Sequence, residues 1–160
     1  MAIVTLKELR TALPKGKRLL GIDQSKNKLG LAVSNPDLTI ATPLKTIMRT
    51  KFAEDVKALA AISKEYGVGG FVIGLPLNMD DSEGPRVDSV RHFADNLIAA
   101  QDALGFSPLI AFLDERLSTQ AAHDFLEEQA NISSKRRAEV IDQLAAQIIL
   151  KGALELMAKA

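Results

Sequence analysis

The sequence predicts an α/β fold, a five-stranded mixed sheet with helices on both faces. Short apolar runs suited to strands alternate with segments whose apolar residues recur at helical spacing. Hydrophobic residues make up 47% of the 160 residues but aromatic residues only 4%, so the core must consist mainly of aliphatic side chains packed between helices and sheet. A chain of this length suits one core, and we expect a short helical appendage over 1–17 and one domain over 18–160.

The elements are predicted from apolar periodicity and from the Gly and Pro residues that interrupt it. Capping-box spacing after Thr5 indicates the N-terminal helix, which Pro14 ends. The further elements are strands over 18–23, 29–34 and 39–48, a helix over 51–66, a strand over 70–74, a helix over 87–105, a strand over 109–113, and helices over 118–128 and 137–157. An antiparallel hairpin unit ahead of two right-handed crossovers is the order of an RNase H-like fold.

Composition restricts the classes of function. The formal net charge is zero, so contacts with nucleic acid must come from local basic clusters. The absence of cysteine excludes disulfides and thiolate metal sites. No apolar run is long enough to span a bilayer and no signal peptide is evident, so we expect a cytoplasmic protein without membrane contact. The basic clusters are Lys15, Lys17 and Arg18; Lys26 and Lys28; Lys45, Arg49 and Lys51; and Lys135, Arg136 and Arg137.

Three carboxylates are candidates for a site. Asp23 ends the first strand and Glu115 follows the last one, at the sheet edge where such folds bind ligands. Asp142 lies beside the apolar face of its helix, where a carboxylate loses hydration at a cost unless a cation or hydrogen bond compensates. Taken singly, Asp23 also fits a turn cap, and Asp142 also fits a salt bridge to Arg116 or Arg137. The polar stripe of the same helix consists of Glu139, Gln143, Gln147, Lys151 and Glu155.

Carboxylates gathered at one edge repel each other, and divalent cations relieve that repulsion. Hard oxygen ligands and the absence of cysteine favour Mg²⁺ or Mn²⁺. In a two-metal site about 3.5–4 Å across, one ion activates water and the other stabilises the leaving oxygen of a phosphodiester. Such a site needs no nucleophilic side chain.

Four sequence blocks form a recognisable pattern: Gly21–Ser34, Val72–Met79 with Glu83–Pro85, Asp114–Thr119 and Asp142–Leu150. In this order they resemble the YqgF family, also called RuvX-like, and the match runs from about Arg18 to the C-terminus. The resemblance implies an RNase H-like nuclease linked to maturation of the 16S ribosomal RNA 5′ end, although older usage calls these proteins Holliday junction resolvases. It also implies that Asp23, Glu115 and Asp142 are the catalytic, metal-binding acids. The sequence departs from the usual family pattern at Ser25, Asn27 and Asn35.

The predicted function is a metal-dependent endonuclease, a hydrolase of ribosome biogenesis and rRNA processing. Its partners would be pre-rRNA and the precursor of the small ribosomal subunit. A resolvase acting on branched DNA stays open, because phosphate contacts and carboxylate chemistry suit both substrates. A noncatalytic RNA-binding assembly module also stays open, whereas a sugar-kinase-like or actin-like ATPase would need a second domain. The residues expected to contact nucleic acid are Lys26, Lys28, Asn78, Arg86, Arg116, Lys135, Arg136 and Arg137.

Overall fold

One five-stranded mixed sheet organises the chain, as predicted. The computed structural model describes residues 3–76, 84–115 and 134–159, of which 134–139 are described as backbone alone. The strand order is β3-β2-β1-β4-β5. Strand β2 is antiparallel to both of its neighbours, whereas β4 and β5 run parallel to β1. The strands are β1 (Arg18–Gln24), β2 (Lys28–Ser34), β3 (Ala41–Met48), β4 (Val68–Leu75) and β5 (Leu109–Asp114).

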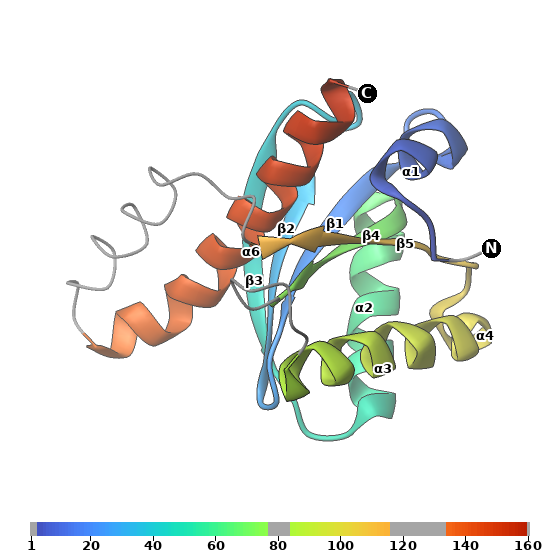
Figure 1. Cartoon of the computed structure of the whole chain (residues 1–160). Helices are drawn as coiled ribbons and strands as arrows, with labels where there is room; N and C mark the ends of the chain where they lie inside the picture. Colours follow the sequence, from blue (N-terminus) through green and yellow to red (C-terminus); the bar gives the residue numbers. More distant parts are fainter. Residues whose placement is uncertain (1–2, 77–83, 116–133, 160) are drawn as a thin grey trace.

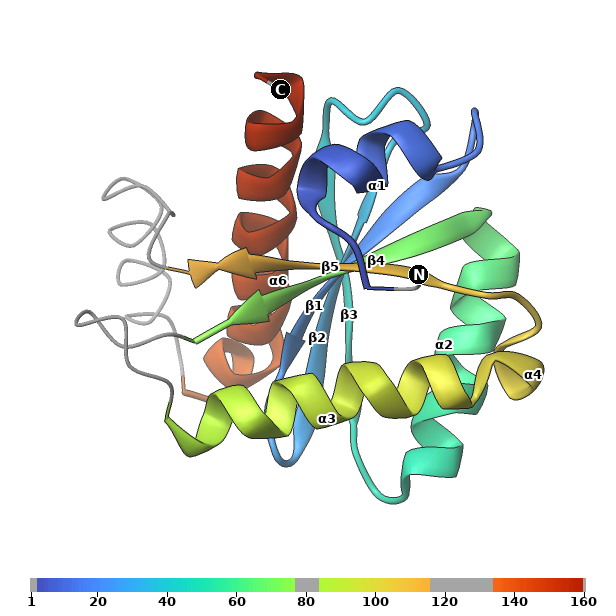
Figure 2. The ribbon, with the colours of Figure 1, turned by 45° about the vertical axis from the view of Figure 1, so that its right-hand side comes forward.

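Helices cover both faces of this sheet (Figures 1 and 2). One face carries α1 and α6, whose apolar side chains pack with Leu19, Val72 and Leu113. The other face carries α2, α3 and α4, which pack on a second core around Phe71 and Ile73. The helices are α1 (Leu6–Ala12), α2 (Phe52–Tyr66), α3 (Pro85–Ala99), α4 (Gln101–Leu104) and α6 (Ser134–Ala158). The helix expected over 118–128 lies outside the described residues.

The N-terminal segment forms the expected short helix and joins the main core. The side chain of Thr5 caps α1 by accepting a hydrogen bond from the backbone N–H of Glu8 at 3.1 Å. Leu9 is fully buried in the same cluster as the apolar face of α6. Because Arg10 donates to the carbonyl of Met157 at 2.5 Å, the first and last helices are also joined by a hydrogen bond.

The hairpin between β1 and β2 is closed by Ser25, one of the positions that departs from the family pattern. Its backbone N–H donates to the carbonyl of Lys28 at 3.0 Å, and its hydroxyl accepts from the N–H of Lys28 at 3.1 Å. Arg49 supports the turn from β3 by donating to the carbonyl of Ser25 at 2.9 Å. The hydroxyl of Ser25 therefore defines the turn that leads away from Asp23.

Arg49 is not free surface charge, although the sequence places it in a basic cluster. Its guanidinium pairs at 2.9 Å with Asp55, which is only 2% exposed, and it lies over the ring of Phe93 at 5.1 Å from the centroid. These contacts join the end of β3 to α2 and α3. The cluster of Lys45, Arg49 and Lys51 is therefore interrupted by a residue with a structural role.

Predicted boundaries differ from the structure at several elements. The helix expected over 87–105 begins two residues earlier, because Pro85 and Arg86 already belong to α3, where proline suits the first turn. The helix expected over 137–157 also begins earlier, at Ser134. The helix expected to end near Gly105 is divided at Ala100 into α3 and α4, and Gly105 ends α4 with a left-handed φ of 87°.

The predicted polar stripe of α6 is not uniformly solvent-facing. Lys151 and Glu155 are exposed, but Gln147 is partly buried and donates to the carbonyl of Ala41 on β3 at 3.0 Å. The reason is that α6 crosses β1, β2 and β3, so part of its polar side also faces the sheet. In the described part of the chain, no helix is long and apolar enough to cross a membrane.

Candidate active site

Asp23 lies on β1 one residue before the strand ends, on the face of the sheet that α6 covers. It pairs in register with Gly30 of the antiparallel strand β2, and paired residues present their side chains to the same face. A side chain at Gly30 would run into Asp142 of α6. Because Asp23 shares that face, its carboxylate is directed toward the same helix.

Three glycines surround Asp23 and let α6 approach the sheet closely. A Cβ at Gly21 would lie 2.7 Å from the Cβ of Leu150, and a Cβ at Gly30 would collide with the backbone of Asp142. At Gly74 of β4, a Cβ would lie 2.5 Å from Cδ1 of Ile149. Side chains at these positions would lift the helix off the sheet. The glycines therefore determine how near Asp142 comes to Asp23.

Glu115 reaches the same place from β5. Strands β1, β4 and β5 are parallel, so their carboxyl ends meet at one edge. Glu115 directly follows β5, and its Oε1 lies 2.6 Å from the point where a Cβ of Gly74 would stand. The missing side chain at Gly74 thus leaves room for the carboxylate of Glu115 between β4 and α6.

The electrostatics show that the carboxylates act on one another. The pKa of Asp23 is raised from 3.8 to about 6, first by burial and then by the charge of Asp142, while Arg86 opposes the rise. Burial also raises the pKa of Glu115, with a further rise from the charge of Asp23 and an opposing effect of Arg86. Asp23 is therefore the middle member of the acidic set, coupled to Asp142 on one side and to Glu115 on the other.

Among the described side chains, Lys28 forms an ion pair with Asp142. Its ammonium lies 3.7 Å from Oδ2 of Asp142, with the two side chains 30% and 21% exposed. Lys28 can make this contact because it begins β2, which α6 covers. Arg116 and the side chain of Arg137, which the sequence suggests as ion-pair partners, lie outside the described part of the chain. Among the residues that the structure describes, no three acidic or histidine side chains converge closely enough to enclose a metal ion. Asp142 pairs with Lys28, and its charge also acts on Asp23.

The residues predicted to contact nucleic acid are distributed around this edge. Lys26 is exposed in the hairpin turn, and Arg86 is exposed in the first turn of α3, from which it acts on Asp23 and Glu115. Asn78 and Arg116 lie outside the described residues. The backbone places Lys135, Arg136 and Arg137 in the first turn of α6 rather than in a loop, and their side chains are not described.

The sequence alone did not indicate that Lys28 pairs with Asp142, or that glycines on β1, β2 and β4 set the position of Asp142. Gly21, Gly30 and Gly74 do not have the spacing of a dinucleotide-binding motif, and no other motif gives them a role. A signal was present, because each glycine interrupts a buried apolar strand, where glycine often marks a close approach of another backbone. The partner in that approach could not be read from local sequence.

Comparison with known proteins identifies relatives over nearly the whole chain. A family model described as "RuvX: Holliday junction resolvase" matches residues 17–156. A protein of Rhodospirillum centenum is 47% identical over 155 residues, covering 97% of this chain and 82% of the relative. One of Cereibacter sphaeroides is 50% identical over 152 residues, covering 94% and 91% of the two chains. Both relatives carry the name "Putative pre-16S rRNA nuclease".

A solved structure shares the fold at low identity. Thermus thermophilus RuvC in complex with a Holliday junction substrate superimposes with a TM-score of 0.55 at 12% identity, over 89% of this chain and 95% of RuvC. Fold, sheet order and relatives together define the class, an RNase H-like nuclease. Within that class, the chain belongs to the RuvX family.

Proposed function

We propose that the chain is a metal-dependent endonuclease that hydrolyses phosphodiester bonds at the edge formed by β1, β5 and α6. One observation carries the proposal: Asp23, with a pKa raised to about 6, is coupled to the carboxylates of both Asp142 and Glu115. Repulsion among partly buried carboxylates lowers the stability of the fold. Groups that conflict with stability in this way are common at functional sites.

The donor set suits Mg²⁺ or Mn²⁺, because Asp23, Glu115 and Asp142 offer only hard carboxylate oxygens. A bound divalent cation supplies an activated water and charge stabilisation for a phosphodiester. The chain itself contributes the positioning: β1 and β5 hold two carboxylates on rigid strand ends, and α6 carries the third. Gly74 leaves room between them, and Arg86 partly offsets the negative charge of the site.

Basic residues around the edge would hold the phosphates of a nucleic acid. Arg86 and Lys28 lie beside the carboxylates, and Lys26 is exposed in the adjoining turn. Lys135, Arg136 and Arg137 occupy the first turn of α6, where the helix dipole disfavours cations. A phosphate near that turn would be favoured both by the dipole and by the three basic residues. Asn78 and Arg116 complete the proposed set from segments outside the described residues.

The substrate we propose is the precursor of 16S ribosomal RNA, cut at its 5′ end. The names of the relatives support this choice. Such a substrate would place the protein in the cytoplasm, beside the precursor of the small ribosomal subunit. The family description and the RuvC complex favour a second candidate, cleavage of four-way DNA junctions.

A cleavage assay distinguishes the two substrates. Purified protein is incubated with precursor 16S RNA or with a four-way DNA junction, in chelator, in Mg²⁺ and in Mn²⁺. We expect cuts near the 5′ end of the RNA that require metal and vanish in Asp23→Asn. Metal-dependent cleavage of the junction alone would support the second candidate instead.

A binding measurement separates catalysis from assembly. If both nucleic acids bind to wild type and to Asp23→Asn but neither is cut in Mg²⁺ or Mn²⁺, the nuclease proposal is wrong and a noncatalytic assembly module remains. Asp95→Asn serves as the matched control, because Asp95 is exposed on α3 and belongs to neither the acidic set nor the basic one.

A further inference from the structure

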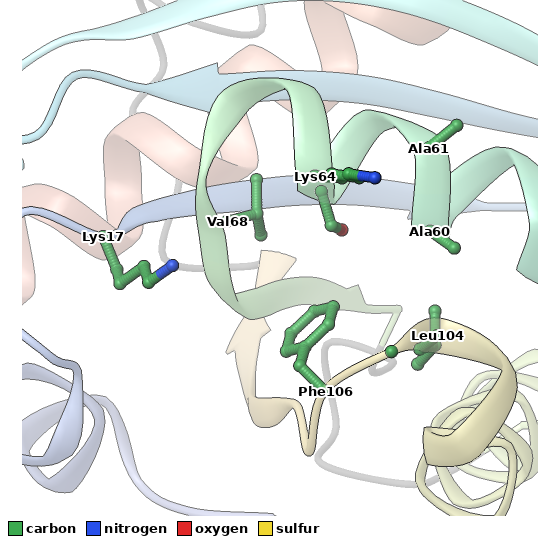
Figure 3. A pocket seen from close by; sticks show the side chains of 9 residues that line it. Lys17, Ala60, Ala61, Lys64, Val68, Leu104 and Phe106 are labelled. Carbon is green, nitrogen blue, oxygen red and sulfur yellow. The ribbon is translucent and has the colours of Figure 1, made fainter.

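A cavity of about 390 Å³ opens at the opposite end of the sheet from the acidic edge. Its lining comes from three segments: the residue before β1, the last turns of α2 with the start of β4, and the end of α4 (Figure 3). Asp23 lies six positions after Lys17 along β1, which corresponds to about 20 Å. The volume falls within the range of small-molecule sites, roughly 300–1,000 Å³.

Ser63 provides an unpartnered polar group in this lining. The residue is only 4% exposed, and its hydroxyl has no hydrogen-bond partner among the residues that the structure describes. A buried hydroxyl without a partner is costly, and such groups in native structures call for a reason. A ligand that accepts or donates a hydrogen bond in the cavity supplies that reason.

The rest of the lining combines an apolar wall with positive charge. Leu104, Val68 and the ring of Phe106 form the wall, and the Phe106 ring is held by edge-to-face contact with Phe71 at 5.9 Å between centroids. Lys17 and Lys64 contribute ammonium groups at the exposed rim. A flat apolar group, a hydrogen bond and a phosphate are the three features that such a lining recognises.

We infer that the cavity binds one unpaired nucleotide, with the base against Phe106 and Ser63 and the phosphate between Lys17 and Lys64. The identification of the ligand as a nucleotide rests on the proposed function, since a nuclease acts on such chains. The cavity lies far from the acidic edge, so it holds a part of the substrate distant from the bond that is cut. A free mononucleotide offers the same chemistry and could occupy the same cavity.

The test is amide NMR titration of the full chain in chelator, so that metal at the acidic edge plays no part. The probes are adenosine monophosphate, a short single-stranded oligoadenylate and inorganic phosphate. We expect the two nucleotide probes to shift the amides of Ser63, Lys64 and Phe106. If oligoadenylate binds more tightly than the mononucleotide, the source is an RNA strand; the reverse order indicates a free nucleotide. Shifts with none of the probes, or equal binding of inorganic phosphate, overturn the inference.

Ser63→Ala separates a ligand role from a structural one. Because the hydroxyl has no partner in the free protein, the variant should melt at or above the wild-type temperature, while nucleotide affinity should fall by about tenfold, the worth of one hydrogen bond. A lower melting temperature with unchanged affinity overturns the inference. Ala61→Trp, on an exposed position of the lining, should block binding without disturbing the core.

Charge removal at the rim has matched controls on the same segments. Lys17→Gln with Lys64→Gln should weaken oligoadenylate binding and flatten its salt dependence by about 0.7, because the two lysines hold one phosphate of a single strand. Lys15→Gln with Lys57→Gln removes two exposed lysines that do not line the cavity and should leave the slope unchanged. If the two double variants change the salt dependence of oligoadenylate binding equally, the inference is overturned. Asp23→Asn should retain cavity binding, so failure of the nuclease proposal and failure of this one are distinguishable.

Discussion

Gly30 on β2 lies directly against the main chain of Asp142 on α6, with no space for even a methyl group between them. The same glycine pairs across the sheet with Asp23. The contact therefore fixes the height of α6 over the sheet at the point where two acidic side chains approach each other. Rigid packing of this kind transmits small changes in volume to the position of neighbouring groups.

Gly30→Ala should destabilise the fold by about 1–3 kcal/mol, because the added methyl group must displace the backbone of α6. Cleavage of any substrate should fall strongly, since Asp142 moves with the helix. Urea denaturation and single-turnover cleavage measure the two effects. Gly152→Ala is the control on the same helix: its Cβ meets only a side-chain tip of Leu113 at 3.1 Å, and the helix gains up to about 1 kcal/mol. Equal stability of the two variants would contradict the packing argument.

The pH dependence of stability in chelator should report on Asp23. Burial and the charge of Asp142 raise its pKa to about 6 in the folded chain, so the folded state holds this proton more tightly than the unfolded state. The resulting stability is fully present below about pH 4 and is lost as the pH rises through about 6, up to about 3 kcal/mol.

Asp23→Asn has no carboxyl group to titrate at this position and should lack this loss. Its free energy of unfolding relative to wild type should therefore increase between about pH 4 and pH 7. Urea denaturation across that range measures the difference, with Asp95→Asn as an exposed control on α3. Parallel pH profiles for wild type and Asp23→Asn would mean that the pKa of Asp23 is not raised. An NMR titration of Asp142→Asn should show the pKa of Asp23 lowered but still above 3.8, because burial is its first cause.

Lys28→Gln should separate metal binding from nucleic-acid binding. Removing the ammonium frees Asp142, so the affinity for Mg²⁺ should rise by roughly fivefold, the upper value of such an exposed ion pair. Nucleic-acid binding should weaken, with a salt slope smaller by about 0.7–0.9. Lys26→Gln, in the same turn, should reproduce only the second effect. Calorimetric titrations with Mg²⁺ and with RNA measure the two affinities. An unchanged Mg²⁺ affinity in Lys28→Gln would mean that the Lys28 ammonium does not compete with Mg²⁺ for the carboxylate of Asp142.

Arg49→Met should cost about 3–5 kcal/mol, because it leaves the carboxylate of Asp55 buried without its cation. Urea denaturation measures the loss. Arg49→Met combined with Asp55→Leu should recover much of it, since no unpaired charge remains. Breaking the exposed pair of Glu54 and Lys57 by Lys57→Met should change stability by less than about 1 kcal/mol. If Arg49→Met and Lys57→Met lose similar amounts of unfolding free energy, burial of the Asp55 carboxylate is not what makes the first ion pair important.

Local sequence was enough to predict most of the elements. Thr5 and Gly67 mark a helix start and a helix end, and the structure has them as cap residues of α1 and α2. The errors lie at boundaries such as Pro85 and Ser134. Proline is compatible both with a loop and with the first turn of a helix, so the start of α3 was ambiguous. The start of α6 was predicted late because its first turn has no apolar periodicity.

The sequence by itself determined the α/β class, the order of helices and strands along the chain and the candidate acids, because periodicity, turn residues and strand ends are properties of short segments. Only the tertiary structure decided that Lys28 is the cation beside Asp142 and that Arg86 acts on both Asp23 and Glu115. These relationships depend on how closely α6 and α3 approach the sheet. That distance is set by packing between residues far apart in the chain, such as Gly30 and Asp142, and no local pattern records it.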